Sequence, residues 1–171
     1  MYGIMERFIH RIDALNNGIG RAVAWLTAVL VAVVCLDVAT SLLRHSFVAL
    51  KELSWHLFAV IFLIGAGFTL RHDRHVRVDV FYTRLSPKGQ AWVNLIGTVL
   101  FLIPFMVVAI FASVEYVSQS FLLDEQSPDP GGLPARWLLK ACIPLGCALL
   151  LLQGVALAMR SVRTLLDREE G

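Results

Sequence analysis

Four long apolar runs decide what this chain can fold into. The runs are residues 22–43, 53–70, 91–114 and 137–159. They are 22, 18, 24 and 23 residues long, and a helix needs about 20 residues to cross a bilayer core of about 30 Å. The second run is short, but a helix that starts near Phe47 would place Lys51 and Glu52 at the headgroup level, where charge is tolerated. We therefore expect an all-α integral membrane protein with four transmembrane helices.

The composition excludes an ordinary soluble domain. Apolar residues make up 57% of the chain and charged residues 16%, whereas soluble domains average about 45–50% and about 25%. The runs mix Leu, Val, Ala and Phe without strict alternation, which favours helices over the strands of a membrane barrel. The net charge of +2 is too small to indicate nucleic-acid binding. Three cysteines within apolar runs predict buried thiols, and their odd number argues against a disulfide framework.

The basic residues predict the orientation in the membrane. Eleven Lys and Arg residues lie before the first run, between the second and third runs, or after the fourth run. Only three lie in the other two loops. Because basic residues are enriched on the cytoplasmic side, we expect both termini in the cytoplasm and the loop before residue 137 outside.

The segment before the first run has the pattern of an amphipathic helix. Its apolar residues recur at helical spacing: Ile4, Phe8, Ile12 and Leu15. Charged residues fall mostly on the opposite face, so residues 4–16 are expected to form a helix in the inner interface. Asn16, Asn17 and Gly18 are expected to break it before the first span. The alternative is a solvated extension of the first transmembrane helix.

Turn and cap residues mark the other boundaries. Ser86 and Pro87 predict the N-cap and first residue of the third helix. The loop before the fourth helix is rich in Pro and Gly, and 130–132 (Pro-Gly-Gly) predicts a turn. Pro104 and Pro144 are expected to kink the third and fourth helices.

Several ionisable residues fall in the outward halves of the expected spans, where such groups are functional candidates. They are Asp37, Arg44, Glu52, His56 and Lys140. These side chains can gather at one depth. Three interpretations remain open: a substrate or proton site, a set of internal ion pairs, or a contact with a partner membrane protein.

The sequence offers little support for an enzyme or a cofactor. Only His56 lies inside a span, whereas a bis-histidine haem needs two facing histidines. His72 and His75 lie near two aspartates, but three interleaved arginines would repel a metal ion. There is no phosphate-binding glycine loop, nucleophile elbow or zinc-protease motif. We therefore expect no cofactor, and the main alternative class is a membrane-anchor subunit of a redox complex.

From about Phe47 to Arg160 the chain resembles the small, four-helix permease subunit of tripartite ATP-independent periplasmic (TRAP) transporters. The first group of matching residues lies at the start of the second span, near its end and in the loop that follows: Glu52, Gly65, Gly67, His75, Arg77 and Asp79. The second group surrounds the start of the fourth span and continues along it: Ser127, Gly131, Gly132, Pro134, Trp137, Lys140, Pro144, Gln153 and Gly154.

The resemblance implies a place in a larger assembly in the bacterial inner membrane. In this family a periplasmic solute-binding protein delivers organic acids to two membrane subunits, and an ion gradient drives uptake. The large subunit carries the substrate site, and the small subunit braces it. A partner-facing surface should carry small or polar residues, and the candidates are Gly65, Gly67, Gly97, Gly146, Gln153 and Gly154.

Overall fold

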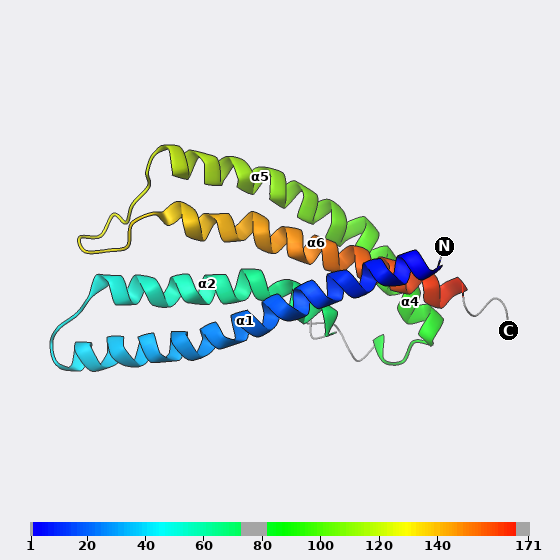
Figure 1. Cartoon of the computed structure of the whole chain (residues 1–171), viewed down its shortest axis with the longest axis horizontal. Coiled ribbons are helices and arrows are strands. Elements are labelled where there is room, and N and C mark those ends of the chain that lie inside the picture. The colour runs from blue at the N-terminus through cyan, green and yellow to red at the C-terminus, as the bar shows by residue number, and fades with distance from the viewer. Residues whose placement is uncertain (1, 73–81, 167–171) are drawn as a thin grey trace.

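The computed structural model describes residues 2–72 and 82–166, and the described residues are helical apart from their connecting loops (Figure 1). The elements are α1 (Tyr2–Leu42), α2 (Val48–Arg71), α4 (Pro87–Gly97), the π-helical turn η1 (Thr98–Leu102), α5 (Ile103–Leu122) and α6 (Arg136–Leu166). Because α4, η1 and α5 follow each other without a break, they make one long helical path.

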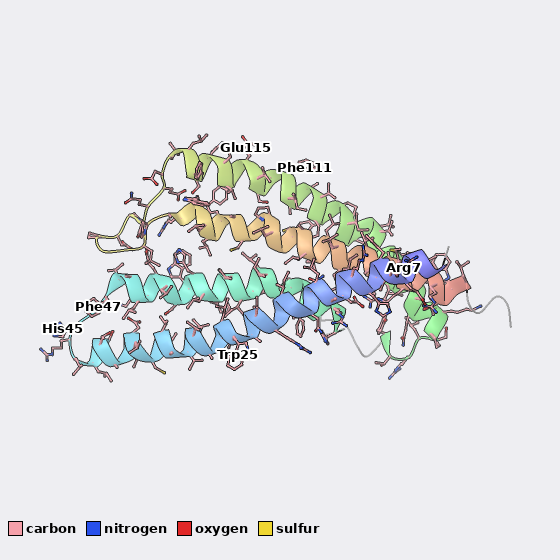
Figure 2. All side chains as sticks on the ribbon, in the orientation of Figure 1. Arg7, Trp25, His45, Phe47, Phe111 and Glu115 are labelled. Carbon is pink, nitrogen blue, oxygen red and sulfur yellow. The ribbon has the colours of Figure 1, made fainter. Side chains whose placement is uncertain are left out.

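In the described part of the chain, four helical segments are long and apolar enough to cross a membrane. They are Met5–Leu42, Val48–Arg71, Pro87–Leu122 and Arg136–Leu166, and each contains one of the apolar runs. Figure 2 shows Trp25 and Phe111 pointing away from the neighbouring helices, and these side chains are 77% and 75% exposed. Such an apolar outer surface suits lipid and not water. The prediction of four transmembrane helices is confirmed.

The helices form a row in the order α1, α2, α6, α5. Helix α2 packs against both α1 and α6, and α5 packs on the other side of α6. At the end that holds both termini, α1 crosses toward α6, and α4 also packs on α6. The central pair of the row is therefore α2 and α6, and these two helices carry most of the residues described below.

The predicted helix break at residues 16–18 is wrong, because α1 runs through these residues without interruption. Asn16 is only 1% exposed. Its side-chain amide donates to Ile12 O at 3.3 Å and to Gln153 Oε1 at 2.9 Å. These bonds satisfy the amide NH2 group inside the helix bundle, so α1 can continue through this residue. A separate helix at 4–16 is thus not present.

The apolar side of the N-terminal part of α1 is divided between two environments. Ile9 and Ile12 are buried and cluster with Ala156 of α6. Phe8 and Leu15 are about half exposed. The segment is therefore an extension of the first helix that packs on α6 with one part of its apolar side.

Small residues let the central helices approach closely. A Cβ atom at Gly146 would lie 2.5 Å from the backbone oxygen of Leu63, which excludes any larger residue there without a shift of α2 against α6. Gly67 faces the Asn16 side chain and Leu149 O in the same way. These glycines therefore allow close packing between helices of the chain itself.

Four of the residues predicted to face a partner subunit lie inside this chain instead. Gly67, Gly146, Gln153 and Gly154 are all buried between helices of the chain itself, so they are not on an outer surface. Within residues 2–72 and 82–166, a Cβ at Gly65 would meet only Val23, and a Cβ at Gly97 would meet nothing within 4 Å.

The start of the third span is as predicted. Ser86 is the N-cap of α4, and its hydroxyl accepts from Gly89 N at 3.2 Å, with Pro87 in the first turn. Farther along, the π-helical turn η1 ends at Leu102, two residues before Pro104. A wider turn accommodates a residue that lacks an N–H donor. Helix α6 continues through Pro144.

Candidate functional site

A buried carboxylate organises the end of the row where residues 123–135 form a loop. Glu52 lies in the second turn of α2 and is only 4% exposed. It accepts hydrogen bonds from Leu133 N at 2.6 Å, from Arg136 Nη2 at 3.2 Å and from the Ser127 hydroxyl. The three donors come from the loop and from the first residue of α6. One carboxylate thus fixes the loop to α2 and α6.

The loop has the backbone geometry that this contact requires. Gly132 N donates to Asp129 O at 3.0 Å, and Gly131 has a φ of +80°. This is a type II turn, with Pro130 at its second position and glycine where φ is positive, and the predicted turn at 130–132 is confirmed. A Cβ at Gly132 would collide with the Ser127 side chain and lie 2.7 Å from Glu52 Oε2. Glycine therefore lets the loop approach the carboxylate.

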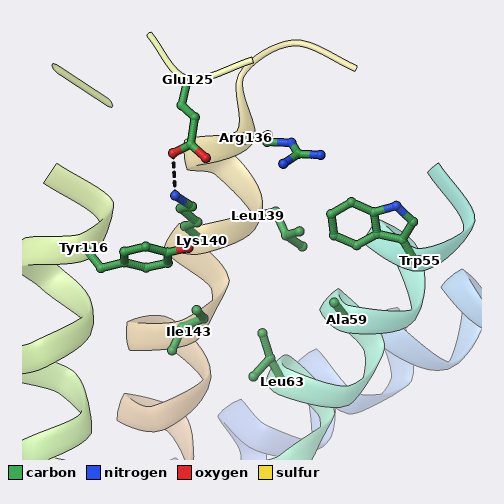
Figure 3. Close-up of a pocket in the computed structure, with 9 residues that line it drawn as sticks. All are labelled: Trp55, Ala59, Leu63, Tyr116, Glu125, Arg136, Leu139, Lys140 and Ile143. Carbon is green, nitrogen blue, oxygen red and sulfur yellow. Dashed lines mark hydrogen bonds and ion pairs between the residues drawn. The ribbon is translucent and has the colours of Figure 1, made fainter. Parts of the chain in front are cut away.

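A second ion pair lies beside the first. Glu125 Oε2 accepts from Lys140 Nζ and, at 2.7 Å, from the Ser120 hydroxyl (Figure 3). Lys140 Nζ also lies 3.8 Å from the centre of the Tyr116 ring, a cation–π contact. The hydrogen bond from Lys140, followed by that from Ser120, lowers the pKa of the Glu125 carboxyl. We call Glu52, Glu125, Ser127, Arg136 and Lys140 the loop cluster.

A cavity of about 260 Å³ opens next to the loop cluster, between α2, α5 and α6 (Figure 3). Its lining combines charged, aromatic and aliphatic side chains: Trp55, Ala59, Leu63, Tyr116, Glu125, Arg136, Leu139, Lys140 and Ile143. The charged groups lie at the loop end, and the aliphatic groups lie deeper along the helices.

The residues predicted to gather are only partly brought together. Glu52 and Lys140 join neighbouring ion pairs, and His56 Nδ1 lies 2.6 Å from the backbone oxygen of Glu52. Asp37 is half-buried on α1, and its Oδ1 has no hydrogen-bond partner among the residues that the structure describes. Arg44 is exposed beyond the end of α1. Neither joins the loop cluster.

Sequence reasoning missed the actual partners of Glu52 and Lys140. Arg136 and Lys140 are four residues apart and share a face of α6, so this spacing was a usable signal. Glu125 and Ser127 lie in a loop, and their positions depend on the turn at 129–132. Of the loop motif after α2, His75, Arg77 and Asp79 fall outside the described residues.

A second polar cluster lies at the opposite end of the row and was not predicted. Asp13 of α1 accepts from Gln153 Nε2 at 3.0 Å and from Arg160 Nη1 at 3.2 Å, both on α6. Arg71 Nε of α2 lies 3.6 Å from the same carboxylate. With Asn16, these residues form the terminus cluster, which ties α1, α2 and α6 together. The seven-residue spacing of Gln153 and Arg160 places both on one face of α6.

The loop cluster and the packing of α2 on α6 lie within the part of the chain that matches a known family. Residues 30–164 match the family of tripartite ATP-independent periplasmic transporters, DctQ component. The chain belongs to this family. No curated protein sequence matches it significantly.

Membership in the DctQ family sets the general role of the chain. The family is the small component of TRAP transporters and is a transporter family, not an enzyme family. Its members work with a large permease and a solute-binding protein. With its four apolar helices, this DctQ component is a multi-pass membrane protein. Asp13 and Asn16 precede the matched residues 30–164. The terminus cluster therefore connects two residues outside the family match to helices α2 and α6.

Proposed function

We propose that the chain is the bracing subunit of a TRAP transporter that takes up organic acids with the energy of an ion gradient. In this proposal the large permease subunit carries the substrate and ion sites, and this chain holds that subunit in the membrane. The periplasmic solute-binding protein works with the assembled complex.

The observation that carries the proposal is the pairing of charges within the chain. Each of the four charged groups in the loop cluster has a partner of opposite sign: Glu52 with Arg136, and Glu125 with Lys140. A free organic anion would add an uncompensated negative charge to a cluster whose charges already cancel. The cluster is thus suited to fixing helices and a loop, and the terminus cluster fixes the same helices at the other end. A subunit held at both ends resists deformation by a moving partner.

The proposal includes the orientation predicted by the basic residues. Both termini face the cytoplasm, and the 123–135 loop faces the periplasm of a bacterial inner membrane. Single cysteines at Thr83 and Gln126, on a cysteine-free background, test this in whole cells with an impermeant maleimide. Labelling at 126 and not at 83 is expected, and the reverse pattern would show that the orientation is inverted.

Assembly is tested by co-expression with the large permease subunit, with a tag on one subunit only, and purification in mild detergent. The wild-type chain should be recovered with its partner. Glu52→Gln and Lys140→Met should lower recovery, because each leaves a poorly solvated charge without its partner. Glu115→Gln, an exposed site on α5, is the matched control and should leave recovery unchanged.

The same complexes separate a bracing role from a substrate site. Uptake should fall in proportion to the amount of complex, and the KM for the organic acid should stay constant. A variant that assembles normally but has a much higher KM would place the loop cluster in the substrate path.

A further inference from the structure

We propose that the cavity beside the loop cluster is a binding site for a zwitterionic phospholipid. This goes beyond the bracing role, because it assigns a ligand to a site on this chain. The ligand class follows from three properties of the lining: its polarity along the helices, its balance of charge, and its unused hydrogen-bonding groups.

Polarity changes along the cavity in the same direction as it changes across a membrane leaflet. Arg136 and Glu125 lie at the loop end, and Leu63 and Ile143 lie deeper (Figure 3). Trp55 and Tyr116 stand on opposite sides between these levels, where aromatic residues are enriched at membrane interfaces. A phospholipid with its headgroup at the loop end and an acyl chain along the aliphatic part matches this gradient.

The charges of the lining select among lipids. The lining carries two cations, Arg136 and Lys140, and one carboxylate, Glu125. The buried carboxylate of Glu52, which pairs with Arg136 just outside the lining, balances the second cation, so the local charge is zero. An anionic headgroup would add an uncompensated negative charge in a partly desolvated place, which is unfavourable. A headgroup that carries both a phosphate and an ammonium adds none.

Arg136, Lys140 and Glu125 keep hydrogen-bonding capacity for such a headgroup beyond the bonds they make within the chain. A guanidinium has five N–H donors and an ammonium three, and the bonds of Arg136 and Lys140 to carboxylates use only some of them. Both bonds to Glu125 end on its Oε2, so Oε1 can accept from the lipid ammonium. Phosphate at the two cations and ammonium at Glu125 would complete the polar end.

Tryptophan fluorescence can report on this site directly. The chain has four tryptophans, of which Trp55 lines the cavity and Trp25 is a highly exposed residue on α1. Two full-length single-tryptophan variants, with the other three changed to Phe, would be reconstituted in vesicles with a small fraction of brominated phosphatidylethanolamine or brominated phosphatidylglycerol. Bromine quenches nearby tryptophan, so excess quenching of Trp55 over Trp25 measures local enrichment of that lipid.

We expect brominated phosphatidylethanolamine to quench Trp55 about threefold or more beyond Trp25, and the phosphatidylglycerol form to give no excess. Ala59→Phe fills the cavity and should remove the excess, whereas Ala112→Phe, an exposed site on α5, should not. The double variant Glu125→Gln, Lys140→Met leaves the cavity open and should lose the preference between the two lipids.

Equal quenching of Trp55 and Trp25 by phosphatidylethanolamine would overturn the proposal and leave the cavity to a side chain of the partner subunit. Equal enrichment of both lipids would also overturn it. So would an excess that survives Ala59→Phe, or a lipid preference that survives the double variant.

Discussion

Asp13 connects three helices through one carboxylate. It receives hydrogen bonds from Gln153 and Arg160 of α6 and lies within ion-pair distance of Arg71 of α2. Gln153 is fully buried and also accepts from Asn16. Loss of the carboxylate would leave two guanidiniums and a buried amide short of an acceptor, and such groups are costly when they cannot reach water.

Asp13→Asn should therefore destabilise the chain by about 2 kcal/mol or more, as for a broken, partly buried charge pair. The matched control is Glu6→Gln, which removes a carboxylate from the same end of α1. Glu6 pairs with Arg163 at 2.6 Å, but both side chains are nearly half exposed, so this change should cost less than about 1 kcal/mol. Unfolding in detergent, followed by circular dichroism, measures both. Equal losses would show that the terminus cluster does not stabilise the fold.

Glu125 gives the chain a pH-dependent contact. Its pKa lies below the ordinary value of 4.5, chiefly through the hydrogen bond from Lys140. A depressed carboxyl pKa contributes stability that is present above pH 4.5 and is lost as the pH falls through the lowered pKa. The wild-type chain should thus have a higher Tm than Glu125→Gln at pH 7, and the difference should shrink as the pH falls below about 4.5.

The Tm of both chains between pH 7 and pH 3 tests this expectation, with Glu115→Gln as an exposed carboxylate control. A Tm difference between wild type and Glu125→Gln that stays constant over the whole range would contradict it.

At the scale of single elements, much of the fold can be predicted from the sequence. Apolar runs of membrane-spanning length gave four helices, and Ser86-Pro87 gave the start of the third span. At residues 16–18 the local sequence pattern predicted a helix break that the structure does not have. Asn-Asn-Gly is a turn signal by itself, but Gln153, which lies 137 residues from Asn16, accepts a hydrogen bond from the amide nitrogen of Asn16 within the bundle. A contact over that distance depends on how α1 packs on α6.

The candidate site was less predictable than the helices. Glu52 and Lys140 were identified because charges are rare in apolar spans, but their ion-pair partners were not predicted. Glu52 pairs with Arg136, and Lys140 pairs with Glu125. These pairings require the loop to fold back on α2 through Gly131 and Gly132, and a glycine-rich loop has too many accessible backbone conformations to predict one.

The contact between α2 and α6 depends on Gly146. A Cβ there would lie 2.5 Å from Leu63 O, and this is a backbone atom that cannot move without its helix. Gly146→Ala should destabilise the chain by about 1–3 kcal/mol, as for overpacking. Gly97→Ala is the control, because a Cβ at Gly97 meets no described residue within 4 Å, and alanine favours a helix by up to about 1 kcal/mol. Unfolding in detergent that shows the two variants equally stable would contradict this account of the helix contact.

At the scale of the whole molecule, the row of helices suits a subunit that works beside another. The central helices α2 and α6 are tied at one end by the loop cluster and at the other by the terminus cluster. Large apolar side chains cover the outer surfaces of the row. This combination leaves broad surfaces for lipid and for a membrane partner, and it fits the small component of a TRAP transporter.

The most direct test of this role is organic-acid uptake into proteoliposomes that contain the small chain alone, the large permease subunit alone, or both. The solute-binding protein and an imposed ion gradient are supplied in every case. The bracing account predicts uptake with both subunits, no uptake with the small chain alone, and strongly reduced uptake with the large subunit alone. Gradient-driven uptake by the small chain alone would contradict the account, because it would require a complete substrate path within these four helices.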